Sequence, residues 1–433
     1  MNKKLLTLAV AAALVAPAAA MADATMYGKL HQSIDYFDVK ASDAASAAAA
    51  VSGVPTETFK GWTLNRGQQG KGAPRSNRMG IKGSEDLGGG LKAIYQVEFG
   101  VTLSDQRGSS NDGDNTSTKG AVNMRNAFVG LAGGWGTFLV GRHDTPLKIS
   151  TGKLDLFADT MADYNGTVGF SDIRADNAIA YISPSFSGFQ FAGALVPGGG
   201  HTVSGYNNVE SDDLAEGWGL AAIYKNGPWY ASAAYETLTK DLGTTEATIG
   251  TDGDLFADSM MMTAGGLAPV SGYVPVLDDD GMETGMYEAA PGTETVVVND
   301  GDWNKWRLGL GILDWNGFYL TGIYEDWSNA PAGGIFVQDN DAKLWQVQAG
   351  YAFGNNMIKA MYGAMDRDTN PEKGRSVAGV VRRVIDDQDR NTWAVAFDHN
   401  FSKRTKAYAV YTDVDEKVAT EQDWSGFSVG MIH

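Results

Sequence analysis

The sequence predicts an all-β chain, a sixteen-stranded antiparallel β-barrel that crosses a membrane. Apolar and polar residues alternate along runs of about ten residues, which is typical of barrel strands with one face to lipid and one to water. Short polar turns recur at similar intervals along the chain. After the first residues, no apolar run reaches the roughly twenty residues that a spanning helix needs. A closed barrel is the other fold that satisfies its backbone within a bilayer.

The strongest hairpin pattern lies at residues 78–99, RMGIKGSEDLGGGLKAIYQVEF. Two arms alternate with period two across a polar, Gly-rich turn at 85–90, as expected of a β-hairpin. One face of each arm carries small, aliphatic and aromatic residues. The other face carries the charges, at Arg78, Lys82, Lys92 and Glu98. We expect apolar faces toward lipid and charged faces toward a water-filled lumen throughout the barrel.

The first 22 residues predict an export leader that is removed from the mature chain. Lys3 and Lys4 precede a short apolar run, and small residues ending at Ala22 form a cleavage pattern. The apolar run is too short to anchor the chain in a membrane. We therefore divide the chain into a leader at 1–22 and a barrel at 23–433.

Seven short turns divide the barrel region into pairs of strands. They lie at residues 86–90, 132–136, 184–188, 225–228, 314–317, 354–356 and 399–404. These turns join fourteen strands, and residues 26–37 and 424–433 add one strand at each end. The opposite ends of the strands carry long polar segments, above all 38–76 and 238–302. This asymmetry is typical of short periplasmic turns and long extracellular loops.

Some predicted strands lack a polar face. Residues 217–224 and 405–412 are small or apolar on both faces. We interpret these strands as a wall that other protein covers, such as a subunit interface. Arg142 shares its face with Phe138 and Val140, so we place it near a subunit contact rather than in the lumen.

The composition excludes several classes of function. The chain contains no cysteine, which excludes disulfides, thiolate metal sites and cysteine nucleophiles. A formal net charge of −18 repels polyanions and argues against nucleic-acid binding. The five histidines lack the spacing of a metal site, and the acidic run Asp278–Asp280 lacks the ligand spacing of a calcium loop. We expect no metal and no cofactor.

Catalytic motifs are also missing. Residues 426–430 match G-x-S-x-G, but a nucleophile elbow requires a helix after the serine, and only three residues follow the match. No pair of carboxylates stands out from the acidic background as a glycosidase couple. We predict that the protein is not an enzyme.

Residues 76–100, SNRMGIKGSEDLGGGLKAIYQVEFG, resemble the second and third strands of the Gram-negative general porins. The similarity recurs at 125–146, 174–191 and 427–433, and it spans most of the chain apart from the long loops. The resemblance implies a homotrimer in the outer membrane, with a water-filled channel for passive diffusion of small hydrophilic solutes and ions. It also implies contacts with outer-membrane lipid and lipopolysaccharide.

In the resembled family, a third loop folds into the lumen and forms a constriction whose acidic residues face arginines on the wall. The matching loop here is 143–172. The resemblance places Arg78, Arg125 and Arg174 on the basic wall. Lys82 shares the inward face of Arg78, four residues on. Opposed charges across a narrow passage order water and orient polar solutes.

The acidic side of this constriction is assigned to Asp155, Asp159 and Asp163. These residues are spaced by four, so a short helix over 153–163 would place them on one face. Acidic residues also dominate the external loop 238–302, and from this acidity we expect a preference for cations.

Alternative functions remain open at this level. A solute-selective porin would have the same fold. A secreted soluble β-rich glycan-binding protein and a surface adhesin belong to different classes, and the long acidic loop would be the active part of an adhesin. The predicted outward aromatic residues argue against the soluble protein, which would need to cover Trp345, Tyr351, Trp393 and Phe397.

Overall fold

The computed structural model describes residues 23–41, 58–64, 76–103, 122–197, 213–238, 302–332, 340–369, 389–417 and 422–433, with short strands within 246–297 and at 335–336. The predicted leader at 1–22 and much of the two predicted long loops lie outside the described residues. The described chain is almost entirely β, with two short helices, α3 (Pro146–Thr151) and α4 (Tyr164–Thr167). No helix among these residues is long and apolar enough to cross a membrane.

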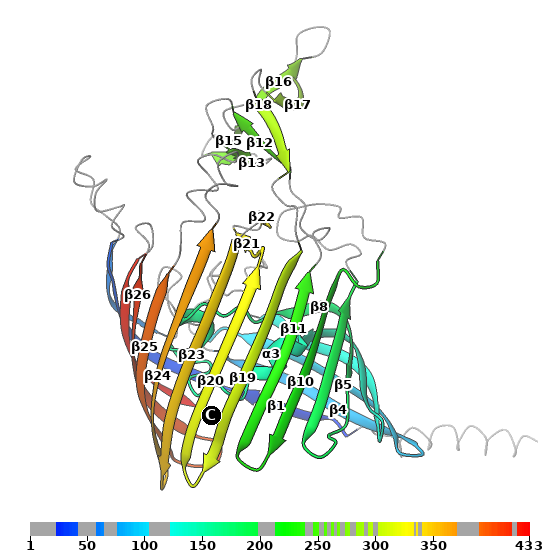
Figure 1. Cartoon of the computed structure of the whole chain (residues 1–433), viewed down its shortest axis with the longest axis vertical. Coiled ribbons are helices and arrows are strands. Elements are labelled where there is room, and N and C mark those ends of the chain that lie inside the picture. Colours follow the sequence, from blue (N-terminus) through cyan, green and yellow to red (C-terminus); the bar gives the residue numbers. More distant parts are fainter. Residues whose placement is uncertain are drawn as a thin grey trace, which may run out of the picture.

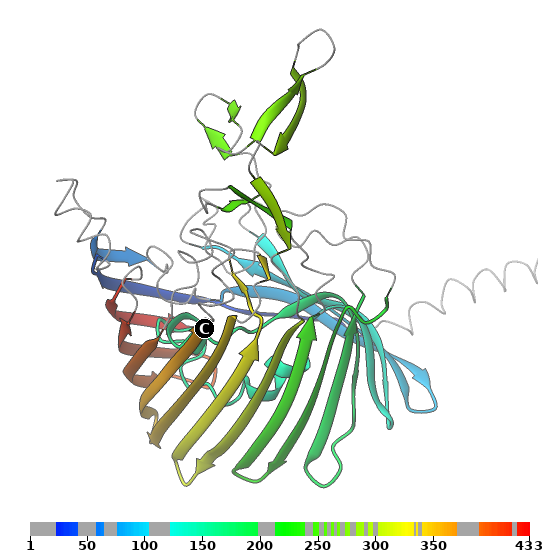
Figure 2. The ribbon, with the colours of Figure 1, turned by 45° about the horizontal axis from the view of Figure 1, so that its top comes forward.

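Eighteen strand segments form one antiparallel sheet that wraps around a central space (Figure 1, Figure 2). In chain order they are β1 (Thr25–Lys29), β2 (His31–Val39), β3 (Phe59–Leu64), β4 (Arg78–Gly88), β5 (Leu91–Val101), β6 (Val122–Gly133), β7 (Gly136–Asp144), β8 (Arg174–Ile182), β9 (Phe189–Val196), β10 (Gly217–Asn226), β11 (Trp229–Leu238), β19 (Trp303–Trp315), β20 (Phe318–Ser328), β23 (Asn340–Phe353), β24 (Asn356–Thr369), β25 (Arg390–Asn400), β26 (Lys406–Glu416) and β27 (Trp424–Ile432).

These segments make sixteen strands, because the first two strands are each divided. Only Leu30 separates β1 from β2, and β4 pairs with β1 while β3 pairs with β2. The ring closes where β2 pairs with β27, from His31 opposite Ile432 to Val39 opposite Trp424. Each of the sixteen strands therefore pairs with a neighbour on both sides along at least part of its length. The predicted sixteen-stranded antiparallel barrel is confirmed.

The two ends of the barrel differ as predicted. The seven short turns join β4 to β5, β6 to β7, β8 to β9, β10 to β11, β19 to β20, β23 to β24 and β25 to β26. Three small sheets stand beyond the opposite end (Figure 1). Their strands are β12 (Glu246–Gly250), β13 (Leu255–Ala257), β14 (Met261–Thr263), β15 (Gly266–Ala268), β16 (Tyr273–Leu277), β17 (Glu283–Ala289) and β18 (Thr293–Val297). A further pair, β21 (Pro331–Ala332) with β22 (Ile335–Phe336), follows β20.

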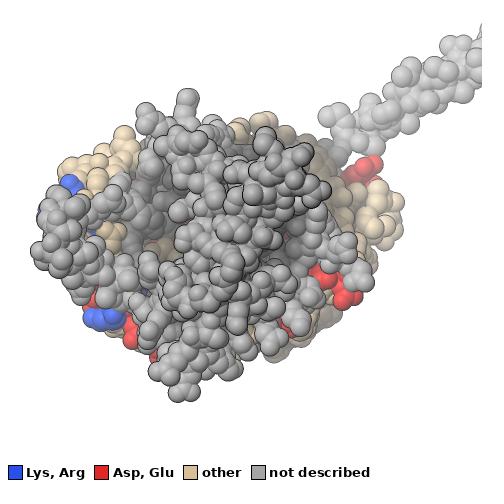
Figure 3. Space-filling view, turned by 90° about the horizontal axis from the view of Figure 1, so that it is seen from above, with Lys and Arg blue, Asp and Glu red and all other residues tan. Residues whose placement is uncertain are grey.

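Apolar side chains alternate onto the outer face of the barrel. On β23 the exposed side chains include Trp345, Val347, Tyr351 and Phe353, whereas Leu344, Gln346 and Gln348 are buried. The same alternation holds on β2, where Ile34 is exposed and its neighbours Ser33 and Asp35 are buried. Seen from the loop end, the described residues that are visible are mostly uncharged, with acidic and basic groups at a few places on the rim (Figure 3). This is the expected surface of a strand wall that faces lipid.

Aromatic side chains form two rows on that outer face. At or beside the short turns, the exposed aromatic residues include Trp135, Phe186, Trp229, Trp315, Phe318, Phe353 and Phe401. A second row lies farther along the strands and is joined by ring contacts, with centroid distances of 5.1 Å for Trp306–Tyr324, 5.6 Å for Trp345–Tyr362 and 5.3 Å for Trp393–Tyr411. Such girdles mark the two interfaces of a membrane barrel.

The inner face is only partly polar. On the strands β20 to β27, buried apolar side chains point inward, among them Ile323, Leu344, Met361, Met365, Val410 and Val414. They pack against Leu154, Phe157 and Met161, which belong to the segment between β7 and β8. The expectation of charged inner faces throughout the barrel is therefore wrong for this half of the wall, because the chain's own segment covers it.

Candidate functional site

The segment between β7 and β8, residues 145–173, lies inside the barrel and is called the inner loop here (Figure 2). The predicted loop, 143–172, differs from it by one or two residues at each end. The inner loop begins with α3, and its N-cap Thr145 accepts a hydrogen bond from the backbone N–H of Lys148 at 3.4 Å. Pro146 occupies the first helical position, where its missing N–H leaves no bond unmade.

Glycines on the inner wall provide the space in which the inner loop lies. A methyl group on Gly309 of β19 would lie 2.5 Å from Leu154 Cδ1, and one on Gly363 of β24 would lie 2.7 Å from Val168 Cγ2. Real side-chain carbons do not approach this closely, so at these two positions the loop can lie where it does because the wall has no side chain.

The inner loop also explains the strands that are apolar on both faces. Leu147 of α3 packs against Ala192, Ala221 and Ala234 on β9, β10 and β11. On β26, Tyr408 and Val410 belong to the core that the loop closes. The prediction of a wall that other parts of the protein cover is thus met on the inner faces of strands 217–224 and 405–412, where the inner loop supplies the cover.

Polar contacts hold the inner loop along one half of the wall. Wall side chains donate hydrogen bonds to its backbone carbonyls: Tyr230 to Ser150 at 2.7 Å, Thr321 to Leu154 at 2.8 Å, Lys359 to Leu156 at 2.6 Å and Lys305 to Ser171 at 2.9 Å. These bonds satisfy loop carbonyls that would otherwise be buried without a partner.

Arg307 of β19 joins the two ends of the inner loop. Its guanidinium is fully buried, and Nη1 lies 2.9 Å from Thr151 Oγ1 and 2.7 Å from Asp172 Oδ1. Its Nε lies 2.5 Å from Glu325 Oε2 on β20. Burial alone would raise the pKa of Asp172, but the nearby cations, Arg307 first, hold it below the ordinary value.

The tip of the inner loop reaches the first strands of the barrel. Asp159 Oδ2 lies 2.5 Å from Lys29 Nζ on β1 and 3.6 Å from Arg78 Nη1 on β4. Burial would raise the pKa of Asp159, but Lys29 and Arg78 lower it to about 2. Its φ of 63° lies in the left-handed region, which Asp tolerates better than most residues.

A second carboxylate organises the cations beside this tip. Glu98 of β5 lies 2.6 Å from Arg125 Nε on β6 and 4.0 Å from Arg78 Nε. The hydroxyl of Tyr27 donates to Glu98 at 2.9 Å. Three cations and two carboxylates therefore meet where β1, β4, β5 and β6 lie side by side. We call Lys29, Arg78, Arg125, Glu98 and Asp159 the charged cluster.

A model of the Gram-negative porin family matches residues 7–419 of the chain. The chain belongs to this family. Because the match is to porins, the prediction that the chain is not an enzyme is confirmed. Family membership also places the protein in the outer membrane, as predicted.

Curated relatives share part of their length with this porin. The major outer membrane protein P.IB of Neisseria meningitidis is 29% identical over 53% of this chain and 57% of its own length. The outer membrane porin protein 32 of Delftia acidovorans is 28% identical over 54% of this chain and 58% of its own. The chain thus spans little more than half the length of these relatives.

Solved structures share the fold over nearly the whole chain. An anion-selective porin from Comamonas acidovorans superposes with a TM-score of 0.58 at 20% identity, covering 95% of this chain and 99% of that one. OmpT of Vibrio cholerae gives a TM-score of 0.54 at 12% identity, covering 95% and 97%. At these identities the likeness concerns the fold alone.

The structure brings together three of the seven predicted constriction residues of this porin. Arg78, Arg125 and Asp159 belong to the charged cluster. Lys82 is exposed nearby, with Nζ 5.3 Å from the centroid of the Tyr27 ring. Arg174 lies apart, at the start of β8, where its Nη2 is 2.9 Å from Asp144 Oδ1.

Asp155 is half-buried and Asp163 is buried, and the hydrogen bonds of both carboxylates go to groups other than the basic residues of the wall. Asp155 Oδ1 accepts hydrogen bonds from Phe157 N and from Gln348 Nε2 on β23, both at 2.9 Å. Asp163 is the N-cap of α4 and also accepts from the backbone N–H of Asp159 at 2.7 Å. Burial raises the pKa of Asp155 to about 6 and, with help from the neighbouring carboxylates, that of Asp163 to about 8.

The short helix over 153–163, which would have placed Asp155, Asp159 and Asp163 on one face, does not form. Successive turns occupy this stretch, because Asp155 and Asp163 bond to backbone N–H groups and Asp159 has a positive φ. The spacing of four therefore does not place the three carboxylates on one face.

Sequence reasoning missed the partners Lys29 and Glu98 and the anchor Arg307. A signal for the first two was available, because Lys29 shares the inward face of His31, and Glu98 alternates with outward Val97. Arg307 alternates in the same way with the exposed Trp306 and Leu308. No local signal shows that Lys29 meets Asp159 or that Arg307 meets Thr151 and Asp172 of the inner loop.

Proposed function

We propose that the chain forms a water-filled channel through which small hydrophilic solutes and ions diffuse passively across the outer membrane. The observation that carries this proposal is a closed ring of strands, apolar outside, whose inner loop is fixed against one half of the wall. The other half, β4 to β8, keeps charged side chains on its inner face, including Arg78, Arg125 and Arg174. A polar passage beside a fixed loop admits hydrated solutes without any bond being made.

We assign the narrowest part of this passage to the charged cluster, with Lys82 beside it. Asp159 carries the acidic role there. Asp155 and Asp163 are assigned to holding the conformation of the inner loop, since their carboxylates accept hydrogen bonds from its backbone N–H groups. Arg174 is placed along the passage, in its own pair with Asp144.

The passage is expected to prefer anions, in contrast to the expectation from loop acidity. In the charged cluster, three cations face two carboxylates. The exposed residues of the inner loop are Gly152, Lys153, Ala158 and Asn165, which include one cation and no acid. Fixed charge in a narrow, low-dielectric passage acts on ions more strongly than charge on a solvated external loop.

Reversal potential across a planar bilayer in a potassium chloride gradient tests both channel and preference. We expect stepwise conductance, and a reversal potential whose sign indicates a preference for anions. Arg78→Ala and Arg125→Ala should each move it toward cations, whereas Lys225→Ala, at a turn of β10, should not. Absence of conductance would refute the channel, and an unchanged potential in both arginine variants would remove them from the constriction.

We also propose that the channel is a homotrimer that contacts outer-membrane lipid and lipopolysaccharide through its apolar outer face. The family resemblance and the two aromatic rows support this assembly. Gel mobility before and after boiling in detergent tests it. A trimer should shift strongly toward smaller apparent mass on boiling, and a chain with the same mobility in both samples would be a monomer.

A further inference from the structure

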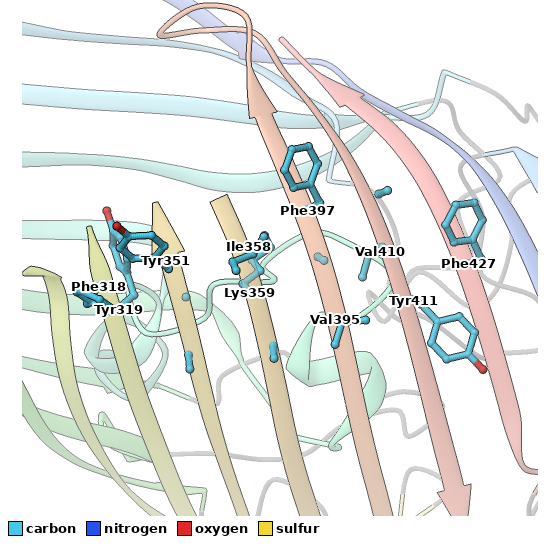
Figure 4. A pocket seen from close by; sticks show the side chains of 15 residues that line it. Phe318, Tyr319, Tyr351, Ile358, Lys359, Val395, Phe397, Val410, Tyr411 and Phe427 are labelled. Carbon is cyan, nitrogen blue, oxygen red and sulfur yellow. The ribbon is translucent and has the colours of Figure 1, made fainter. Parts of the chain in front are cut away.

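An apolar groove crosses the outer wall over β20 and β23 to β27 (Figure 4). Its volume is about 750 Å³. Phe318 and Tyr351 stand at one end and Phe397 and Phe427 at the other, with Ile358 between them (Figure 4). All five side chains are exposed on the outer face.

Small residues form the floor of the groove. Ala349 on β23 lies opposite Ala360 on β24, and Ala409 on β26 lies opposite Phe397. Because these three positions carry only a methyl group, the flanking aromatic rings stand above them. The result is a furrow in a wall whose other outward positions are mostly large.

One of the short turns beside the strands of the groove is basic. It joins β25 to β26 and contains Lys403 and Arg404, both exposed and neither in an ion pair within the described part of the chain. Ala409 lies four residues from Thr405 in this turn, about 13 Å along the strand. All seven short turns are described, and in the other six the residues between the strands include no basic side chain.

We propose that the groove seats an acyl chain of an anionic glycerophospholipid whose phosphate contacts Lys403 and Arg404. The lipid belongs to the leaflet on the side of the short turns. Apolar burial and basic side chains at the membrane surface each contribute to such binding. A zwitterionic lipid carries a compensating positive charge in its headgroup, so it gains less from the two cations.

Native mass spectrometry of the detergent-solubilised full chain tests the proposal, with phosphatidylglycerol and phosphatidylcholine as the two probes. We expect phosphatidylglycerol to bind more tightly than phosphatidylcholine. The double variant K403A/R404A should lose about tenfold of that affinity, consistent with two surface cations. Ala409→Leu, which narrows the groove, should weaken phosphatidylglycerol binding without changing the charge.

Two matched controls separate the groove from the rest of the wall. Ala233→Leu adds the same side chain at an outward alanine on β11, and Lys225→Ala removes an exposed cation near the end of β10. Both should bind phosphatidylglycerol as the unaltered chain does. Equal binding of the two lipids, or binding that K403A/R404A and Ala409→Leu leave unchanged, would overturn the proposal. A changed oligomeric state with unchanged lipid binding would instead assign the groove to a second barrel.

Discussion

Asp159 on the inner loop and Lys29 on β1 form an ion pair of 2.5 Å, so the tip of the loop is joined to the first strand of the barrel. Arg78 lies 3.6 Å from the same carboxylate oxygen. The loop therefore crosses the interior from its anchor at Arg307 to the opposite wall. We therefore expect the proposed passage to lie beside the loop rather than between its acids and the arginines.

Asp159→Asn should loosen the tip of the inner loop. The carboxyl pKa is lowered from 3.8 to about 2, which corresponds to about 2 kcal/mol of folding free energy. Because the pKa is depressed, this stabilisation is present above pH 4 and is lost as the pH falls toward 2. At pH 7, urea unfolding in detergent should show a lower free energy of unfolding for Asp159→Asn than for the unaltered chain. The reversal potential should also move further toward anions, since one negative charge has gone.

Lys60→Ala provides the control for this variant. Lys60 pairs with Asp38 at 2.6 Å on the exposed part of β2 and β3, away from the inner loop. Exposed pairs contribute little to stability. If Asp159→Asn changed unfolding no more than Lys60→Ala does, the joining role of Asp159 would be refuted.

Arg307→Met should destabilise the chain by about 3–5 kcal/mol, because it leaves Glu325 and Asp172 buried without their cation. Both ends of the inner loop would lose a contact at once. The double variant R307M/E325Q should recover part of the loss, since a neutral amide costs less to bury than a carboxylate. Unfolding midpoints in detergent measure both effects. A single variant as stable as the unaltered chain would contradict the anchor role.

Gly309→Val tests whether the wall glycines make room for the inner loop. A Cβ at Gly309 would lie 2.5 Å from Leu154 Cδ1, so the loop or the strand must move, at a cost of about 1–3 kcal/mol. The matched control is Gly322→Val on β20, where the nearest heavy atom to an added Cβ is 3.7 Å away. Single-channel conductance should change in the first variant and not in the second. Equal effects would show that valine disturbs the strand and not the loop contact.

The barrel could be predicted because strand alternation is local. Ile34 and Trp345 face outward for the same reason, that each sits between two inward residues in a period-two run. Arg78 and Arg125 could be placed on the inner wall by parity and by family position. Their meeting at Glu98 depends on the register between β4, β5 and β6, which no single strand contains.

The division of the interior could not be predicted from local pattern. Val410 and Arg125 both point inward, but the inner loop covers Val410 and leaves Arg125 on the open half of the wall. The position of the loop depends on contacts between residues far apart in sequence, such as Leu154 with Gly309. The role of Asp163 depends on the backbone conformation around it, because a spacing of four places residues on one face only where a helix forms. Here the carboxylate instead caps the next helix.

Asp163 should make the inner loop sensitive to alkaline pH. Burial, and then the carboxylates of Asp155 and Asp159, raise its pKa to about 8. A raised carboxyl pKa means that the folded chain binds the proton more tightly than the unfolded chain, so stability falls as the pH rises from about 4 to 8 and levels off above 8. Asp163→Asn keeps an N-cap oxygen but cannot ionise. We expect the unaltered chain to lose unfolding free energy between pH 6.5 and 9, and the variant to lose much less.

The control is Lys60→Ala, which removes an exposed charge that lies away from the inner loop and its carboxylates. The pH dependence of this control between 6.5 and 9 should match that of the unaltered chain. Asp163→Asn is expected to be less stable at pH 6.5, because its amide nitrogen cannot accept the bond from Asp159 N–H. The slope with pH, and not the absolute stability, is therefore the decisive quantity. An unchanged slope in Asp163→Asn would assign the alkaline sensitivity to another group.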